Sequence, residues 1–191
     1  MRPSLTASLL YLMACSTPTT TPQVDAHPTV ETAYKPTTTA AKVDLVALHA
    51  AEGSDPVRAT ELWLMATLQY ADPATRDQGR SALTALTLPF QEGRGWETLP
   101  SAATFKDRML HQPHILRSYA VGATPANGYA AKDFELNVHE SRKDPHGRGW
   151  AVLVISGGAD SPRPIYLKEV NGLYYPHNFS NAYVAIRPPK Q

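Results

Sequence analysis

The spacing of apolar residues changes once along this chain, close to Pro113. Before that proline, apolar residues recur every three or four positions, as on one face of a helix. After it, apolar and polar residues alternate over residues 134–139, which is the pattern of a half-buried strand. Helices followed by strands predict an α+β domain, with about three to four helices packed on an antiparallel sheet of about four to five strands.

The helical part has clear start and stop signals. Asp55 is a good N-cap, and Pro56 suits the first position of a helix. Asp72-Pro73 repeats this chemistry, and Gly53 is a candidate helix stop. The predicted helices cover residues 43–52, residues 56–71, a segment from Pro73 toward Pro89, and a weaker segment at 100–110.

The second part reads as a series of strands. After a turn at 144–147, the β-branched run at 150–155 predicts a central strand. Asn171-Gly172 is the preferred two-residue turn for a hairpin between 165–170 and 173–179. Residues 183–186 are predicted to close the sheet. An NTF2-like or cystatin-like fold is one concrete form of this element order.

The N-terminus resembles a bacterial lipoprotein signal peptide. Arg2 supplies positive charge, residues 4–13 supply an apolar run, and Leu12-Met13-Ala14-Cys15 resembles a lipobox. The run is too short to span a membrane, which takes about 20 residues, and fits a cleavable signal. The resemblance implies cleavage before Cys15 and lipidation of that cysteine. Ser16 at the next position implies export to the outer membrane if the host has two membranes.

A Thr/Pro-rich segment then separates this start from the helical part. Its prolines favour extended chain, and its isolated apolar residues cannot build a core. The predicted organisation is a signal peptide at 1–14, a tether at 15–41 and a single globular α+β domain at 42–191.

Composition excludes two classes of function. Arg2 is the only charged residue before Cys15, so the remaining chain carries equal numbers of basic and acidic side chains. A nucleic-acid binder normally shows a basic patch, and no nucleic-acid partner is expected. Cys15 is the only cysteine, so its lipidation would leave no thiol for disulfides, zinc binding or catalysis.

Two segments resemble an uncharacterised family of bacterial domains. The first runs from Arg117-Ser118-Tyr119 through Gly-Ala-Thr-Pro-Ala-Asn-Gly-Tyr at 122–129. The second contains Gly-Ala-Asp-Ser-Pro-Arg-Pro-Ile at 158–165. The resemblance covers residues 113–188, with Tyr174 or Tyr175 where the family is expected to have a tryptophan. It implies a shared fold and no catalytic residues.

These segments also hold the candidate binding residues. Asp160 can cap its own turn, and Arg163, held between two prolines, can reach back to it. Either this pair pins the loop, or Arg163 binds an anion, since its fork suits carboxylate or sugar oxygens. Tyr129 could line a groove, and Trp96, in a Gly-rich loop, is a candidate exposed contact.

Signals for metal or catalytic chemistry are weak. His111 and His114 are three residues apart, but Pro113 breaks a regular helix between them. There is no HExxH string and no elbow motif around a serine. An arrangement of Ser161, His139 and Asp160 stays open, and no metal or cofactor is predicted.

Two classes of function therefore remain. The first is an envelope binding or structural module, anchored to the membrane by lipid, with a protein, peptide or glycan partner. The second is a hydrolase- or isomerase-like enzyme, with a buried Asp160, His139 or tyrosine acting in a pocket. A deep pocket around a desolvated carboxylate or histidine would favour the enzyme.

Overall fold

The computed structural model describes residues 43–90, 95–131 and 133–190. The predicted signal peptide, lipobox and tether, Cys15 included, lie outside the described residues. The helices are α1 (Leu45–Glu52), α2 (Pro56–Ala71), α3 (Arg76–Leu86), α4 (Ala103–His111) and α5 (His114–Arg117). The strands are β1 (Val138–Lys143), β2 (Trp150–Val154), β3 (Arg163–Val170) and β4 (Leu173–Asn178). This confirms the α+β class.

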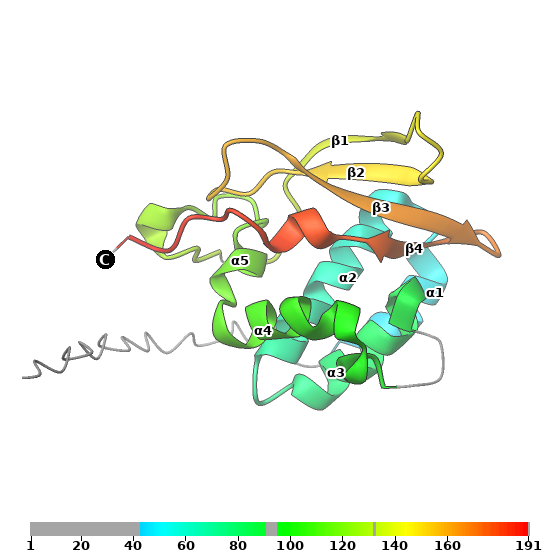
Figure 1. Ribbon diagram of the computed structural model, residues 1–191, viewed down its shortest axis with the longest axis horizontal. Coiled ribbons are helices and arrows are strands. Elements are labelled where there is room, and N and C mark those ends of the chain that lie inside the picture. Colours follow the sequence, from blue (N-terminus) through cyan, green and yellow to red (C-terminus); the bar gives the residue numbers. More distant parts are fainter. Residues whose placement is uncertain (1–42, 91–94, 132, 191) are drawn as a thin grey trace, which may run out of the picture. The chain divides into compact units, whose positions relative to one another are not determined.

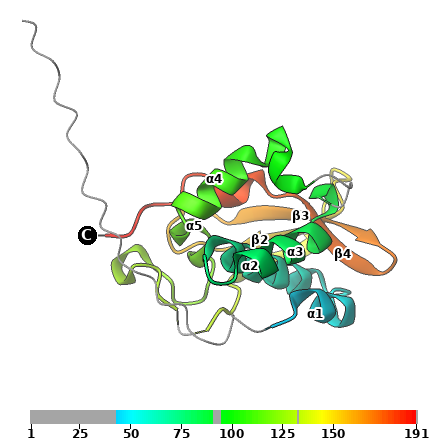
Figure 2. The same cartoon turned by 90° about the horizontal axis from the view of Figure 1, so that it is seen from below.

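The four strands form one antiparallel sheet in the order β1-β2-β3-β4. The helices lie on one side of this sheet, as two perpendicular views show (Figures 1 and 2). Helix α2 is central to the layer: it packs on the sheet and also contacts α1, α3 and α4. The sheet contributes four fully buried aliphatic side chains to the shared core: Val152, Val154, Ile165 and Leu167.

Local chemistry explains most element boundaries. The Asp55 carboxylate accepts a hydrogen bond from the Val57 amide, and Pro56 opens α2 as predicted. The hairpin between β3 and β4 turns at Asn171 and Gly172, whose φ angles are 52° and 80°. Both positions need positive φ in this turn type, so Asn-Gly is well suited to it. Between β1 and β2, the Asp144 carboxylate accepts hydrogen bonds from the side chain and backbone of Arg148, which holds the pKa of Asp144 well below its usual range.

The third helix begins later than predicted. The Asp72 carboxylate accepts a hydrogen bond from the Ala74 amide within a turn, and α3 starts only at Arg76. The Thr75 hydroxyl, at the N-cap position, donates to the Gln69 carbonyl of α2 rather than capping its own helix. The fourth helix is close to its prediction, with a short 3₁₀ turn (Pro100–Ala102) before α4.

Two strand predictions were wrong in detail. Residues 135–137 lie outside β1. Their backbone pairs mainly with residues 119–121, where Val121 donates to Glu135 and Asn137 donates to Tyr119, and the Asn137 carbonyl accepts from Ile155. Residues 183–186 do not form a closing strand. A 3₁₀ turn (Ser180–Tyr183) comes first, and Ala185 has a φ of 54°, which is incompatible with extended chain.

Candidate functional site

The two motif segments and the C-terminal residues meet in one place. We call residues 117–129 the first motif, residues 156–165 the second motif and residues 184–190 the strap; the two motifs together are called the motif cluster, and the strap lies against it. In Figure 1 the red C-terminal segment runs beside the yellow-green loops of the first motif. The Lys190 amide donates to the Pro125 carbonyl at 2.8 Å, which joins the far end of the strap to the first motif.

A chain of buried hydroxyl groups joins the two motifs. Ser156 Oγ donates to Ser118 Oγ at 2.7 Å, and Ser118 Oγ donates to the Ile115 carbonyl at 2.5 Å. The Gly158 amide donates to Ser156 Oγ, and the Gly157 amide donates to the Ser118 carbonyl. Each hydroxyl therefore has partners, as buried polar groups require. This network is a structural joint between the motifs.

Gly157 and Gly158 allow the motifs to come this close. A Cβ at Gly157 would lie 2.9 Å from the carbonyl carbon of Ala123 and 3.3 Å from Thr124 Cα. A Cβ at Gly158 would overlap the Tyr129 hydroxyl. Only glycine leaves room for this backbone approach.

Tyr129 is a structural residue, and the prediction that it lines a groove was wrong. Its side chain is fully buried, and its ring lies against that of His114 with centroids 5.8 Å apart. Its hydroxyl donates to the Arg187 carbonyl of the strap at 2.5 Å. Burial raises the pKa of Tyr129, so its hydroxyl stays protonated as a donor.

Asp160 does not pair with Arg163, contrary to the prediction. Its carboxylate pairs with the Arg187 guanidinium of the strap. Arg163 lies at the start of β3, and its Nη2 donates to the Ala185 carbonyl at a long 3.4 Å. No carboxylate of the described residues pairs with Arg163, and its buried Nε has no hydrogen-bond partner. Asp160 therefore pairs with a different arginine, and Arg163 has no acidic partner among residues 43–90, 95–131 and 133–190.

Trp96 lies outside this cluster and is not an exposed contact. Its side chain is fully buried and stacks on Phe90, with centroids 4.8 Å apart. Tyr70 and Phe105 also contact it in the core of the helical layer. The neighbouring glycines suggested exposure, but the large apolar area of an indole favours burial wherever a core can take it.

The remaining catalytic and metal candidates are not brought together. Within the described part of the chain, no hydrogen bond joins Ser161, His139 and Asp160, and no group of three potential ligands could hold a metal ion. The Asp160 side chain is 88% exposed, and His139 is exposed on β1. His111 pairs with Asp107 on its own helix. His114 is half-buried; burial, with a smaller effect of Arg117, lowers its pKa.

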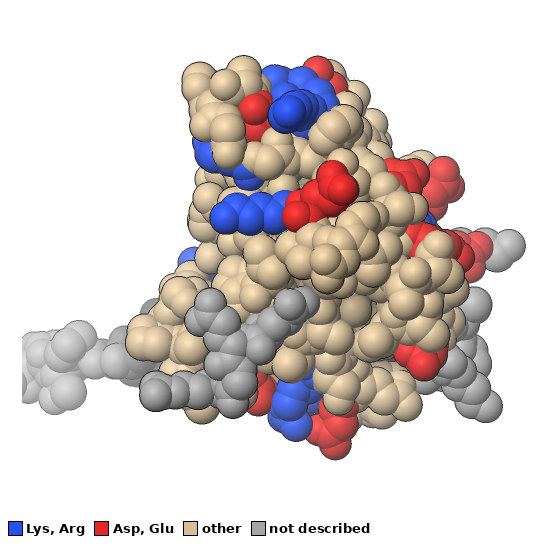
Figure 3. Space-filling model, turned by 90° about the vertical axis from the view of Figure 1, so that its right-hand side faces the viewer, with Lys and Arg blue, Asp and Glu red and all other residues tan. Residues whose placement is uncertain are grey.

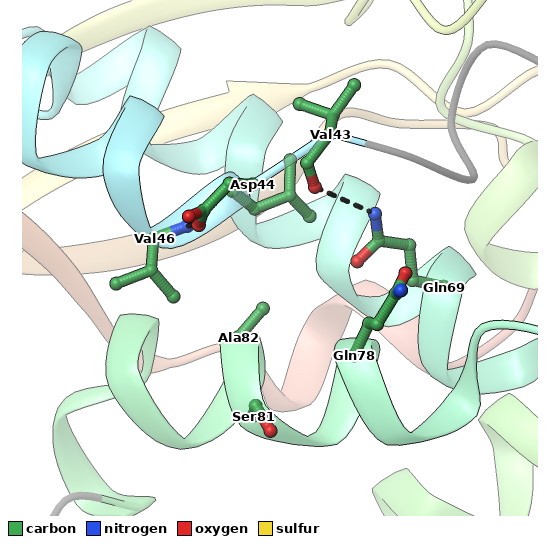
Figure 4. A pocket seen from close by; sticks show the side chains of 8 residues that line it. Val43, Asp44, Val46, Gln69, Gln78, Ser81 and Ala82 are labelled. Atoms are coloured by element: carbon green, nitrogen blue, oxygen red, sulfur yellow. Dashed lines mark hydrogen bonds between the residues drawn. The ribbon is translucent and has the colours of Figure 1, made fainter.

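A separate pocket of about 330 Å³ lies among α1, α2 and α3 (Figure 4). It shares no residue with the motif cluster. Asp44 and Val46 come from the start of α1, Gln69 comes from α2, and Ser81 and Ala82 come from α3. The Asp44 carboxylate is already engaged, because it caps α1 by accepting from the Val46 and Ala47 amides. Its other polar side chains are Gln69, Gln78 and Ser81, and the rest of its lining is apolar.

Charges on the face shown in Figure 3 lie in small groups of both signs. No helix among the described residues is long and apolar enough to cross a bilayer. Sequence reasoning missed Arg187 as a contributor to this site, and it placed Ser118 in the first motif without predicting its hydrogen bonds. Arg187 had a weak signal, an isolated basic residue before Pro188-Pro189.

Comparison with known proteins gives one match. Residues 37–190 match a family described as a domain of unknown function, DUF6935. No curated protein and no solved structure matches the chain. The matched region includes all of the described residues, with both motifs and the strap. The chain therefore belongs to the DUF6935 family, which confirms the expectation of an uncharacterised domain family.

Proposed function

We propose that this protein is a lipid-anchored module of the bacterial envelope, held off the membrane by its tether. The support is the order of segments in the sequence: a basic start, an apolar run, the lipobox ending at Cys15 and a Thr/Pro-rich stretch. A diacylglyceryl group plus a further acyl chain would anchor it firmly, because each buried methylene contributes about 0.8 kcal/mol. Residue 16 is serine, which favours the outer membrane in a host with two membranes.

The module's function in this proposal is binding, and Arg163 is its contact point. This role is supported by the Arg163 guanidinium, which makes one long hydrogen bond to a backbone carbonyl and pairs with no described carboxylate. An arginine fork with unused donors suits carboxylate or hydroxyl oxygens. The partner is accordingly an envelope protein, a peptide or a glycan that presents such oxygens.

The binding test compares three forms of the full chain in affinity capture from detergent-solubilised envelopes. We expect Arg163→Ala to lose a specific partner and Arg163→Lys to retain it only weakly, because lysine cannot form the two-pronged contact. Arg142→Ala is the matched control, since Arg142 is an exposed strand arginine that pairs with Glu140. Equal capture by all forms, with melting temperatures unchanged, would remove Arg163 from the proposed site.

The anchoring test uses Cys15→Ser. The unaltered chain is expected to incorporate a labelled fatty acid and to partition into detergent, and the variant is expected to do neither. Incorporation that persists in the variant would show that Cys15 is not the acceptor.

A further inference from the structure

The strap occupies the motif cluster in the manner of a bound peptide. Its Arg187 amide donates to the Gly158 carbonyl at 2.9 Å, and its Arg187 carbonyl accepts from Tyr129. Its Arg187 side chain pairs with Asp160, and its Ala185 carbonyl accepts from Arg163. Backbone contacts of this kind give affinity, and a side-chain contact gives specificity, as in the recognition of extended peptides.

Most side chains of the strap are exposed, whereas Ile186 is half-buried against the cluster of Ala120, Ala123 and Tyr129. Val184, Ala185, Arg187, Pro188 and Lys190 are exposed. Its Arg187–Asp160 pair is also exposed, and such pairs contribute little to stability. Segments with few buried apolar contacts open at low free energy.

Backbone strain in the strap also favours its release. Ala185 has a φ of 54°, in the left-handed region that costs free energy for a residue with a Cβ. Departure of the strap would uncover the Tyr129 hydroxyl, which donates to Arg187, and the Gly158 carbonyl, which accepts from Arg187. A departing strap therefore leaves a donor and an acceptor with which another extended chain can pair.

We propose that the motif cluster binds an extended peptide segment containing Arg-Pro, supplied in trans, and that the strap is its internal competitor. Asp160 would take the arginine, Tyr129 and Gly158 would bind the peptide backbone, and Arg163 would bind a carbonyl oxygen. This inference rests on the proposed function, because it places the partner at the same cluster and names its class.

The test uses the full chain and a fluorescently labelled peptide, Ala-Ile-Arg-Pro-Pro-Lys, which copies residues 185–190. Two variants change the strap in opposite directions. Ala185→Pro forbids positive φ and should release the strap, whereas Ala185→Gly removes the strain and should hold it. In fluorescence anisotropy we expect Ala185→Pro to bind the peptide about 10-fold more tightly than the unaltered chain. The reason is that the state with the strap in place cannot bind the peptide, so the apparent affinity for the peptide falls as that state becomes more populated. Ala185→Gly should bind a few-fold more weakly.

Charge reversal tests where the peptide binds. On the Ala185→Pro background, Asp160→Arg should lose the peptide and gain a version in which glutamate replaces the arginine. Because both Asp160 and the strap are exposed, the folded core should survive, and near-UV circular dichroism with thermal melting checks this. If Ala185→Pro were unfolded, the weakening in Ala185→Gly would still decide the question.

Failure of this inference is distinguishable from failure of the proposed function. Absence of peptide binding to every form, with the core intact, would overturn the peptide proposal. Peptide binding that does not change with the charge at residue 160 would also overturn the peptide proposal. Loss of the envelope partner in Arg163→Ala would stand in either case as support for the binding module.

Discussion

Gly157→Ala should be among the most destabilising small substitutions in the chain. The new Cβ would overlap the Ala123 carbonyl oxygen and lie 2.9 Å from the carbonyl carbon. Both are backbone atoms, so no side chain can rotate away. Forcing a methyl group into such a site costs about 1–3 kcal/mol. Movement would also break the hydrogen bond from the Gly157 amide to the Ser118 carbonyl, which leaves buried groups unpaired at a further cost of about 1–3 kcal/mol.

The expected total is about 4 kcal/mol of unfolding free energy. For a domain of this size, that corresponds to a fall in melting temperature of about 8–16 °C. Urea unfolding followed by tryptophan fluorescence measures it. Gly95→Ala is the matched control, because a Cβ there meets nothing within 4 Å, and it should change stability by less than about 0.5 kcal/mol. If both variants changed the free energy of unfolding by less than about 0.5 kcal/mol, the close contact between the motifs would be refuted.

Two further predictions test the core and the cluster. Trp96→Ala should reduce the free energy of unfolding by about 3–5 kcal/mol, because it empties a fully buried site; a near-neutral result in denaturant titration would show that the indole is not in the core. Burial lowers the pKa of His114, so the folded state binds its proton less readily than the unfolded state does. The contribution of His114 to the free energy of unfolding is therefore complete above the ordinary histidine pKa of about 6.5, and it is lost as the pH falls through the lower pKa of the folded state. His114→Gln should therefore flatten the decline in melting temperature between about pH 6.5 and 5, and parallel curves would contradict the assignment.

The sequence predicted features whose causes are local. Asp55-Pro56 starts a helix because its carboxylate and fixed φ suit the first turn wherever the helix packs. Asn171-Gly172 turns the hairpin because both residues tolerate positive φ. Asp72-Pro73 shows the limit of such reasoning. At this position Asp and Pro form a turn and do not start a helix, because the Thr75 hydroxyl donates to a carbonyl of α2 instead of capping α3.

The candidate site was predictable only in part. Asp160, Arg163 and Tyr129 were chosen from two unusual segments, and the structure brings these segments together. Their roles were not predictable, because the partner of Asp160 lies 27 residues away in a strap whose path depends on Ala185 leaving the extended conformation. Nothing in the local sequence reports such a distant contact.

By itself, then, the sequence determined the order of most helices and strands and the position of the hairpin turn. These follow from hydrophobic period, capping and turn chemistry, which act over a few residues. Only the tertiary structure decided that Trp96 is in the core, that Arg187 rather than Arg163 neutralises Asp160, and that the C-terminal strap lies on the motifs. Burial and charge pairing depend on which distant segments pack together, and that choice is made by the whole fold.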